Sequence, residues 1–177
     1  MAVLPWILAT IVLTANNSPA VGQIGAFYFE NVGTHSELWI RLVPQGVESG
    51  PDPFQLNVTV SFPGRQLEHQ PDAVELRVES TAGAFPDRVR QPLFSLLLGD
   101  AELNLTGTQY SFQFLAKCQD CSADTVTARV PFSVLRDMTA SKTVVIKALG
   151  FSARLTPAAL AALGKYVATL SSGVAIE

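Results

Sequence analysis

The chain has 177 residues, of which 48% are hydrophobic and 15% are charged, and its formal net charge is -3 at pH 7. This composition excludes intrinsic disorder, which accompanies low hydrophobicity and high net charge, and the length suits one domain with a sizeable core. Lys and Arg together number 12 and are scattered along the chain. Because the chain as a whole is negatively charged, these residues provide no general attraction to nucleic acid, and we expect no nucleic-acid partner.

The N-terminal segment MAVLPWILATIVLTA is uncharged and mostly apolar. It is shorter than the roughly 20 apolar residues of a membrane-spanning helix, and it is typical of the apolar core of a secretory signal peptide. Ser18 and Ala20 supply small residues for a cleavage site. We therefore predict a cleaved signal peptide at 1–20 and a secreted or periplasmic protein without an integral membrane span. A retained anchor or a buried N-terminal segment is the alternative, because no Lys or Arg precedes Arg41.

Alternation of apolar and polar residues predicts a series of β-strands in the rest of the chain. Two β-rich runs, 27–32 and 37–43, are separated by Gly-Thr-His-Ser and predict a hairpin with His35 in its turn. The apolar run at 93–100 fits either a buried strand or a short helix. Further strands are predicted at 54–62, 73–80, 101–106, 110–116 and 125–132.

The pattern changes near the C-terminus. A short helix is predicted at 133–141 with Leu135 and Met138 inward, and two strands follow on either side of Gly150. Thr156 is a favourable N-cap for a last helix that begins at Pro157. Its apolar stripe comprises Leu160, Leu163, Val167 and Leu170. This order predicts an α+β fold, a mainly antiparallel β-sheet or sandwich with a short helix and a C-terminal amphipathic helix packed on one face, in a single domain at 21–177.

The successive segments VPFSVLRDM, KTVVIKALGFSARL and TPAALAALGKY resemble the ending of many exported bacterial proteins of unknown function. In those proteins a short helix, a two-stranded hairpin and a terminal helix follow one another. The resemblance covers about the last quarter of the chain. It implies a cell-envelope or secreted setting and carries no catalytic residue across.

Cys118 and Cys121 lie between two predicted strands. A redox motif requires a helix N-terminus in a βαβ context, and a structural zinc requires four ligands, for which His35 and His69 are the other strong donors. A haem attachment site requires a histidine where Ser122 stands. We therefore predict a small disulfide at the tip of a hairpin, formed in an oxidising compartment, and expect no metal and no cofactor. Metal, redox and free-thiol roles are the alternatives.

No nucleophile elbow, zinc-protease or nucleotide-binding motif occurs in the sequence. His35 and His69 are the remaining candidate site residues, and neither has an identifiable partner in the sequence. Long loops at 44–53, 63–72 and 83–92 are where binding residues are expected. We expect an exported, non-catalytic binding or accessory protein of the cell envelope or extracellular space, with a protein or small molecule as partner. The alternatives are a secreted hydrolase-type enzyme with a loop histidine as base and a membrane-anchored subunit of an envelope complex.

Overall fold

The structure is a computed structural model that describes residues 22–29, 33–43, 54–64, 67–80, 94–114 and 122–172. The larger of its two sheets has six strands in the spatial order β1 (Gly22–Phe29), β2 (Gly33–Leu42), β3 (Phe54–Phe62), β4 (Ala73–Ser80), β8 (Ser122–Pro131) and β7 (Gln109–Phe114). The smaller sheet has four, in the order β10 (Phe151–Arg154), β9 (Val144–Ala148), β5 (Ser95–Leu98) and β6 (Ala101–Asn104). The helices are α1 (Phe132–Ala140) and α2 (Pro157–Ser172).

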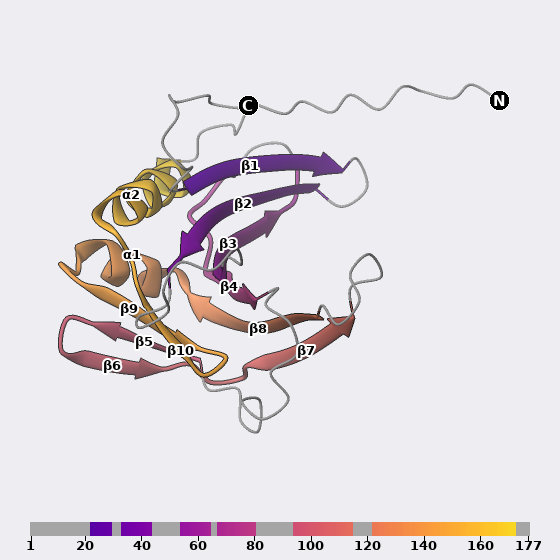
Figure 1. Ribbon diagram of the computed structural model, residues 1–177. Helices are drawn as coiled ribbons and strands as arrows, with labels where there is room; N and C mark the ends of the chain where they lie inside the picture. Colours follow the sequence, from indigo (N-terminus) through magenta and orange to yellow (C-terminus); the bar gives the residue numbers. More distant parts are fainter. Residues whose placement is uncertain are drawn as a thin grey trace, which may run out of the picture.

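All strand pairs are antiparallel within the described part of the chain. The helix α2 contacts α1 and the strands β1 and β2 of the larger sheet, and α1 also contacts β8 (Figure 1). The predicted α+β class, with its mainly antiparallel sheet and C-terminal helix, is confirmed. The run at 93–100 contains β5, so its strand alternative is the correct one.

The order of the larger sheet depends on an excursion of the chain. After β4 the chain forms β5 and β6 in the smaller sheet, and it then returns as β7 and β8. On its return β8 pairs with β4 and leaves β7 at the edge. Side chains about 50 positions apart in sequence therefore become direct neighbours: Glu75 lies opposite Arg129, and Arg77 lies opposite Thr127.

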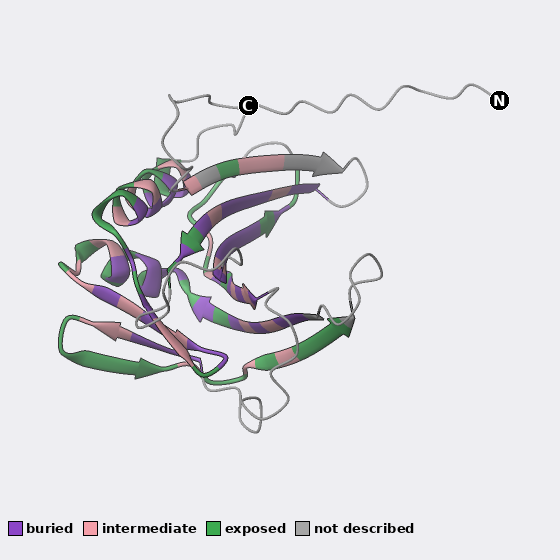
Figure 2. Cartoon of the chain, in the orientation of Figure 1, coloured by how far each residue is buried: buried purple, intermediate pink, exposed green. Residues whose placement is uncertain are grey.

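One face of the larger sheet belongs to the hydrophobic core. Leu38, Val58, Leu76 and Ala128 form a continuous cross-strand row, and each is at most 1% exposed. The core continues into α1, α2 and the smaller sheet. Buried residues accordingly alternate with half-buried and exposed ones along β4 and β8 (Figure 2). We call the opposite surface, which carries the alternate residues of β2, β3, β4, β8 and β7, the polar face.

The C-terminal helix follows the sequence prediction closely. The backbone N–H of Ala159 donates a hydrogen bond to Thr156 Oγ1 at 3.1 Å, so the predicted N-cap is confirmed. Leu163, Val167 and Leu170 are buried in the core, and Leu160 packs against it. In α1, Leu135 and Met138 are fully buried, as their spacing predicted.

The prediction that His35 occupies a turn is wrong. The second strand begins at Gly33, and His35 lies within it, directly opposite Ser61 of β3. Gly33 has φ +104°, and a Cβ at this position would collide with the backbone carbonyl of Phe62. His69 lies exposed in the segment between β3 and β4, as predicted.

Tertiary hydrogen bonds explain why a turn-like Gly-Thr-His-Ser sequence forms a strand. Thr34 Oγ1 donates to the backbone carbonyl of Gly64 at 2.6 Å. The hydroxyl of Tyr166 hydrogen-bonds to Ser36, at 2.9 Å from the carbonyl oxygen of Ser36 and 3.1 Å from its Oγ. Because these partners come from other parts of the fold, they override the local preference of small polar residues for turns.

The predicted signal peptide at 1–20, and Cys118 and Cys121 with their predicted disulfide, lie outside the described residues. The same holds for 44–53 and 83–92. Among the helices that the structure describes, none combines the length and the hydropathy needed to cross a membrane.

Substituting Tyr166→Phe should lower the free energy of unfolding by about 1–2 kcal/mol. The substitution removes the hydroxyl that hydrogen-bonds to both the buried carbonyl oxygen and the Oγ of Ser36. Urea denaturation would measure the change. The control is Lys165→Ala on the exposed side of the same helix, which we expect to stay within about 0.5 kcal/mol of the parent. Equal stabilities for Tyr166→Phe and the parent would contradict a role of this hydroxyl in joining α2 to β2.

Candidate functional site

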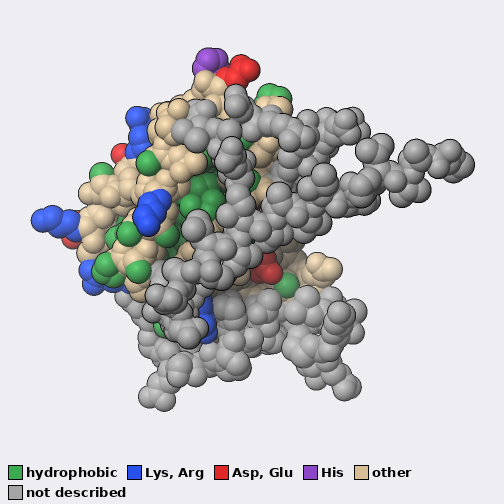
Figure 3. Space-filling model, turned by 90° about the horizontal axis from the view of Figure 1, so that it is seen from above, with side chains coloured by type: hydrophobic (Ala, Val, Ile, Leu, Met, Phe, Trp, Pro, Cys, Tyr) green, Lys and Arg blue, Asp and Glu red, His purple; other side chains and the backbone are tan. Residues whose placement is uncertain are grey.

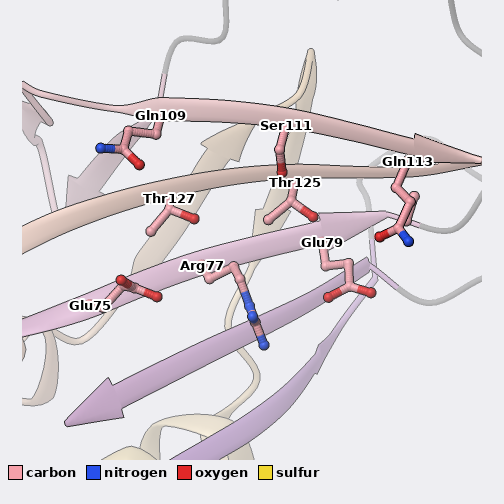
Figure 4. A pocket seen from close by; sticks show the side chains of 9 residues that line it. Glu75, Arg77, Glu79, Gln109, Ser111, Gln113, Thr125 and Thr127 are labelled. Carbon is pink, nitrogen blue, oxygen red and sulfur yellow. The ribbon is translucent and has the colours of Figure 1, made fainter. Parts of the chain in front are cut away.

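The polar face contains a pocket of about 360 Å³ over β4, β8 and β7 (Figure 4). Its size is at the small end of the roughly 300–1,000 Å³ range of small-molecule sites. Every lining residue except Ala123 is polar, and they are Glu75, Arg77 and Glu79 of β4, Thr125 and Thr127 of β8, and Gln109, Ser111 and Gln113 of β7.

The strand register explains why these side chains converge. Residues two apart on a strand point to the same face, and directly opposed residues on antiparallel neighbours have Cβ atoms about 4.5–5.5 Å apart. Two cross-strand rows result: one is Arg77, Thr127 and Gln109, and the other is Glu79, Thr125 and Ser111. The pocket is therefore built on paired strands, which hold side chains more firmly than loops do.

Arg77 is held by a buried carboxylate outside the pocket. Its Nη2 donates to Glu37 Oε1 at 3.1 Å, and the Glu37 side chain is only 8% exposed. Because Glu37 lies on β2, the guanidinium reaches across β3, and Figure 4 shows it directed away from the side chains of β8. This pairing neutralises the one positive charge of the pocket lining.

Glu75 and Glu79 lie on either side of Arg77 along β4 and line the pocket. Neither makes a hydrogen bond or ion pair with any residue in the described ranges. Arg77 Nε is buried and lacks a hydrogen-bond partner among the same residues. The lining therefore offers two carboxylates with free acceptor capacity, together with amides and hydroxyls that donate and accept.

A second polar cluster adjoins the pocket on β2 and β3. His35 Nδ1 and Ser61 Oγ lie 3.1 Å apart in a hydrogen bond, and His35 Nε2 lies 3.9 Å from Glu37 Oε2. Glu37 thus links His35 to Arg77. Neither His35 nor Ser61 lines the pocket. The structure consequently gives His35 partners that the sequence did not reveal.

The other sequence candidates do not join this site. His69 makes no hydrogen bond or ion pair with the residues that the structure describes. Those residues also contain no group of three or more His, Cys, Asp or Glu side chains placed to hold a metal ion. Lys and Arg side chains are separated from one another on the described surface seen in Figure 3, which therefore presents no concentrated positive charge.

A partly buried hydrogen bond on the opposite side of the sheet from the pocket ties down the pocket's outer wall. Tyr110 OH donates to Asp124 Oδ1 at 2.6 Å, and Asp124 is 4% exposed. Both residues belong to the core face of the larger sheet, opposite the pocket. Burial, together with the acceptor carboxylate, raises the pKa of Tyr110 to about 12. The hydroxyl therefore keeps its proton at neutral pH and ties the edge strand β7 to β8.

The pocket lies on strands, whereas the sequence led us to expect binding residues on the loops. All of the lining residues are strand residues. They are the polar halves of alternating patterns, such as Glu75-Leu76-Arg77-Val78-Glu79, that indicate a solvated strand face. The one feature of the sequence that pointed to the pocket is that three such strands each carry amides, hydroxyls or charged groups on one side. Their adjacency could not be read from the sequence.

No protein-family model, no curated protein and no solved structure matches the chain.

Two ion pairs in different environments make the role of Arg77 testable. Arg77→Met should cost about 1–3 kcal/mol of stability, because it leaves Glu37 buried without its cationic partner. Lys147→Met breaks the pair with Glu102, whose members are 41% and 45% exposed, and should cost much less than Arg77→Met because solvent screens an exposed pair. Urea denaturation of both variants provides the comparison.

The control for this pair of variants is Glu37→Gln. In that background Arg77→Met should cost less than it does alone, because no buried charge is then left behind. If the two Met substitutions were equally costly, the pair with Glu37 would not be a structural support of the pocket.

Proposed function

We propose that this is an exported, non-catalytic binding protein that holds a small polar ligand in the pocket over β4, β8 and β7. The observation that supports this proposal is the preformed hollow itself, which gathers polar side chains from three adjacent strands. Surface side chains of a sheet usually face bulk water separately. Here they line a common, half-open volume of about 360 Å³, and two of them, Glu75 and Glu79, make no hydrogen bond or ion pair with the residues that the structure describes.

The rigidity of the pocket favours binding. Arg77 is fixed by Glu37, and β7 is fixed to β8 by Tyr110 and Asp124. A site that is already organised loses little conformational entropy when a ligand enters. Among the described residues, no lining hydroxyl contacts a histidine, so the pocket lacks an activated nucleophile of the serine-hydrolase kind.

The exported setting is part of the same proposal and rests on the sequence. Its support is the uncharged apolar N-terminus, the closely spaced Cys118 and Cys121, and the resemblance of the C-terminal segments to exported bacterial proteins.

Filling the pocket should abolish ligand binding. Ser111→Trp places a large ring in the hollow from the exposed face of an edge strand, whereas Ser133→Trp, exposed on α1, is the matched control. Amide chemical shifts of the labelled protein would be recorded with glucose, cellobiose, spermidine and glucose 6-phosphate. We expect at least one probe to shift resonances of β4, β8 and β7 in the parent and in Ser133→Trp, but none to do so in Ser111→Trp. Shifts confined to other elements, or none at all, would contradict the proposal.

The contact between His35 and Ser61 favours a second candidate, a hydrolase. A hydroxyl bonded to an imidazole that also faces a carboxylate is the arrangement that activates a serine nucleophile. It ranks second because His35 and Ser61 are direct cross-strand partners, so that the register alone brings them together. In addition, Glu37 already balances Arg77, and no lining residue of the pocket belongs to β3.

A fluorophosphonate probe separates the two candidates. A hydrolase would be labelled at Ser61 and would cleave p-nitrophenyl acetate, and either Ser61→Ala or His35→Ala would reduce that rate by at least about 100-fold. For a binding protein we expect no labelling and a hydrolysis rate equal in the parent and both variants. Stoichiometric labelling of Ser61 would make the hydrolase the leading function.

A further inference from the structure

We infer that the pocket binds a neutral saccharide, either free or as a unit of a longer glycan, through its neighbouring hydroxyl groups. This inference rests on the proposed binding function and names the chemical class of the ligand. It follows from excluding ligand classes that the lining cannot satisfy and from the mixture of hydrogen-bonding groups that the lining presents.

An apolar ligand does not fit. Among the described residues that line the pocket, Ala123 is the one apolar side chain and none is aromatic. Entry of an apolar molecule would remove water from carboxylates, amides and hydroxyls without replacing their hydrogen bonds, which is unfavourable for every polar group that is desolvated.

An anionic ligand does not fit either. The lining contains one cation, Arg77, whose guanidinium is already paired with Glu37. Glu75 and Glu79 flank it on the same strand and point to the same face. A phosphate or carboxylate in the pocket would therefore meet two like charges and no uncommitted positive charge.

A purely cationic ligand would satisfy only part of the lining. An ammonium group donates hydrogen bonds and accepts none. It would pair with Glu75 and Glu79 but leave the amide NH2 groups of Gln109 and Gln113 without acceptors. Desolvating donors without giving them a partner weakens binding.

A sugar hydroxyl matches this mixture because it donates and accepts at the same atom. Its O–H can donate to the carboxylates of Glu75 and Glu79, and its oxygen can accept from the amides of Gln109 and Gln113. Hydroxyls on adjacent ring carbons repeat this pairing on one rigid frame. The volume of about 360 Å³ suits a mono- or disaccharide unit.

The chemistry of the lining also predicts the character of binding. Without aromatic stacking, affinity depends on hydrogen bonds that replace those made to water, so we expect weak binding, with dissociation constants of about 0.1–1 mM. Because the ligand is uncharged, binding should change little between low and high salt, unlike that of a polycation.

The experiment begins with an array of immobilised plant, fungal, bacterial and animal glycans, followed by calorimetric titration of the best soluble oligosaccharide. Gln109→Ala/Gln113→Ala removes both amides from an exposed edge strand and should weaken binding at least about tenfold. Asn104→Ala, which removes an exposed amide from the smaller sheet, is the matched control and should bind as the parent does. Thr127→Val provides a second, isosteric variant that should bind severalfold more weakly.

The outcomes separate this inference from the binding proposal. If no glycan binds while spermidine or glucose 6-phosphate shifts the pocket resonances in a manner that Ser111→Trp abolishes, the saccharide class is wrong and the pocket remains a binding site. If no probe of any class shifts those resonances, both proposals fail. Glycan binding that is unaffected by the Gln109/Gln113 and Thr127 variants, with thermal melts showing that they fold, would also overturn the assignment to this pocket.

Discussion

Burial of alternate side chains against the helices and the smaller sheet fixes the register of the larger sheet. The row from Leu38 to Ala128 crosses four strands and is almost completely inaccessible to solvent. A slip of one residue in any strand would move its apolar residues to the polar face, so alternative registers are strongly disfavoured. The same constraint places Glu75, Arg77 and Glu79 together on the other side. The pocket is thus a geometric consequence of the core.

Buried polar groups give this apolar framework its specific arrangement. Tyr166 joins α2 to β2 through Ser36, and Asp124 joins β8 to the edge strand through Tyr110. The Glu37 carboxylate, almost fully buried on the polar face, draws Arg77 across an intervening strand. Each of these groups requires a particular partner once it is removed from water, so the hydrogen bonds penalise incorrect packing more than they increase stability.

Local signals in the sequence predicted local structure. The alternation at 54–62 predicted the third strand, and Thr156 with Pro157 predicted the start of the last helix. Both predictions hold because these features depend on interactions between residues close together in the sequence. His35 was misplaced because its strand is held by tertiary hydrogen bonds, from Thr34 to the carbonyl of Gly64 and from Tyr166 to Ser36. The candidate site required knowledge that β8 inserts beside β4, which depends on how the entire sheet packs. Sequence patterning therefore predicted the fold class, and only the three-dimensional pairing revealed the pocket.

The location of the pocket at the edge of the sheet has a further consequence. Its outer wall, β7, pairs with β8 on one side, and an edge strand with one partner is held less firmly than a central strand. The bond from Tyr110 to Asp124 compensates on the opposite face, and the raised pKa of Tyr110 keeps the donor protonated well above neutral pH. The wall that carries Gln109 and Gln113 thus stays in place without covering the hollow. A site built in this way can admit one unit of a long polymer while the rest of the polymer remains in solvent, which is the access that a glycan ligand requires.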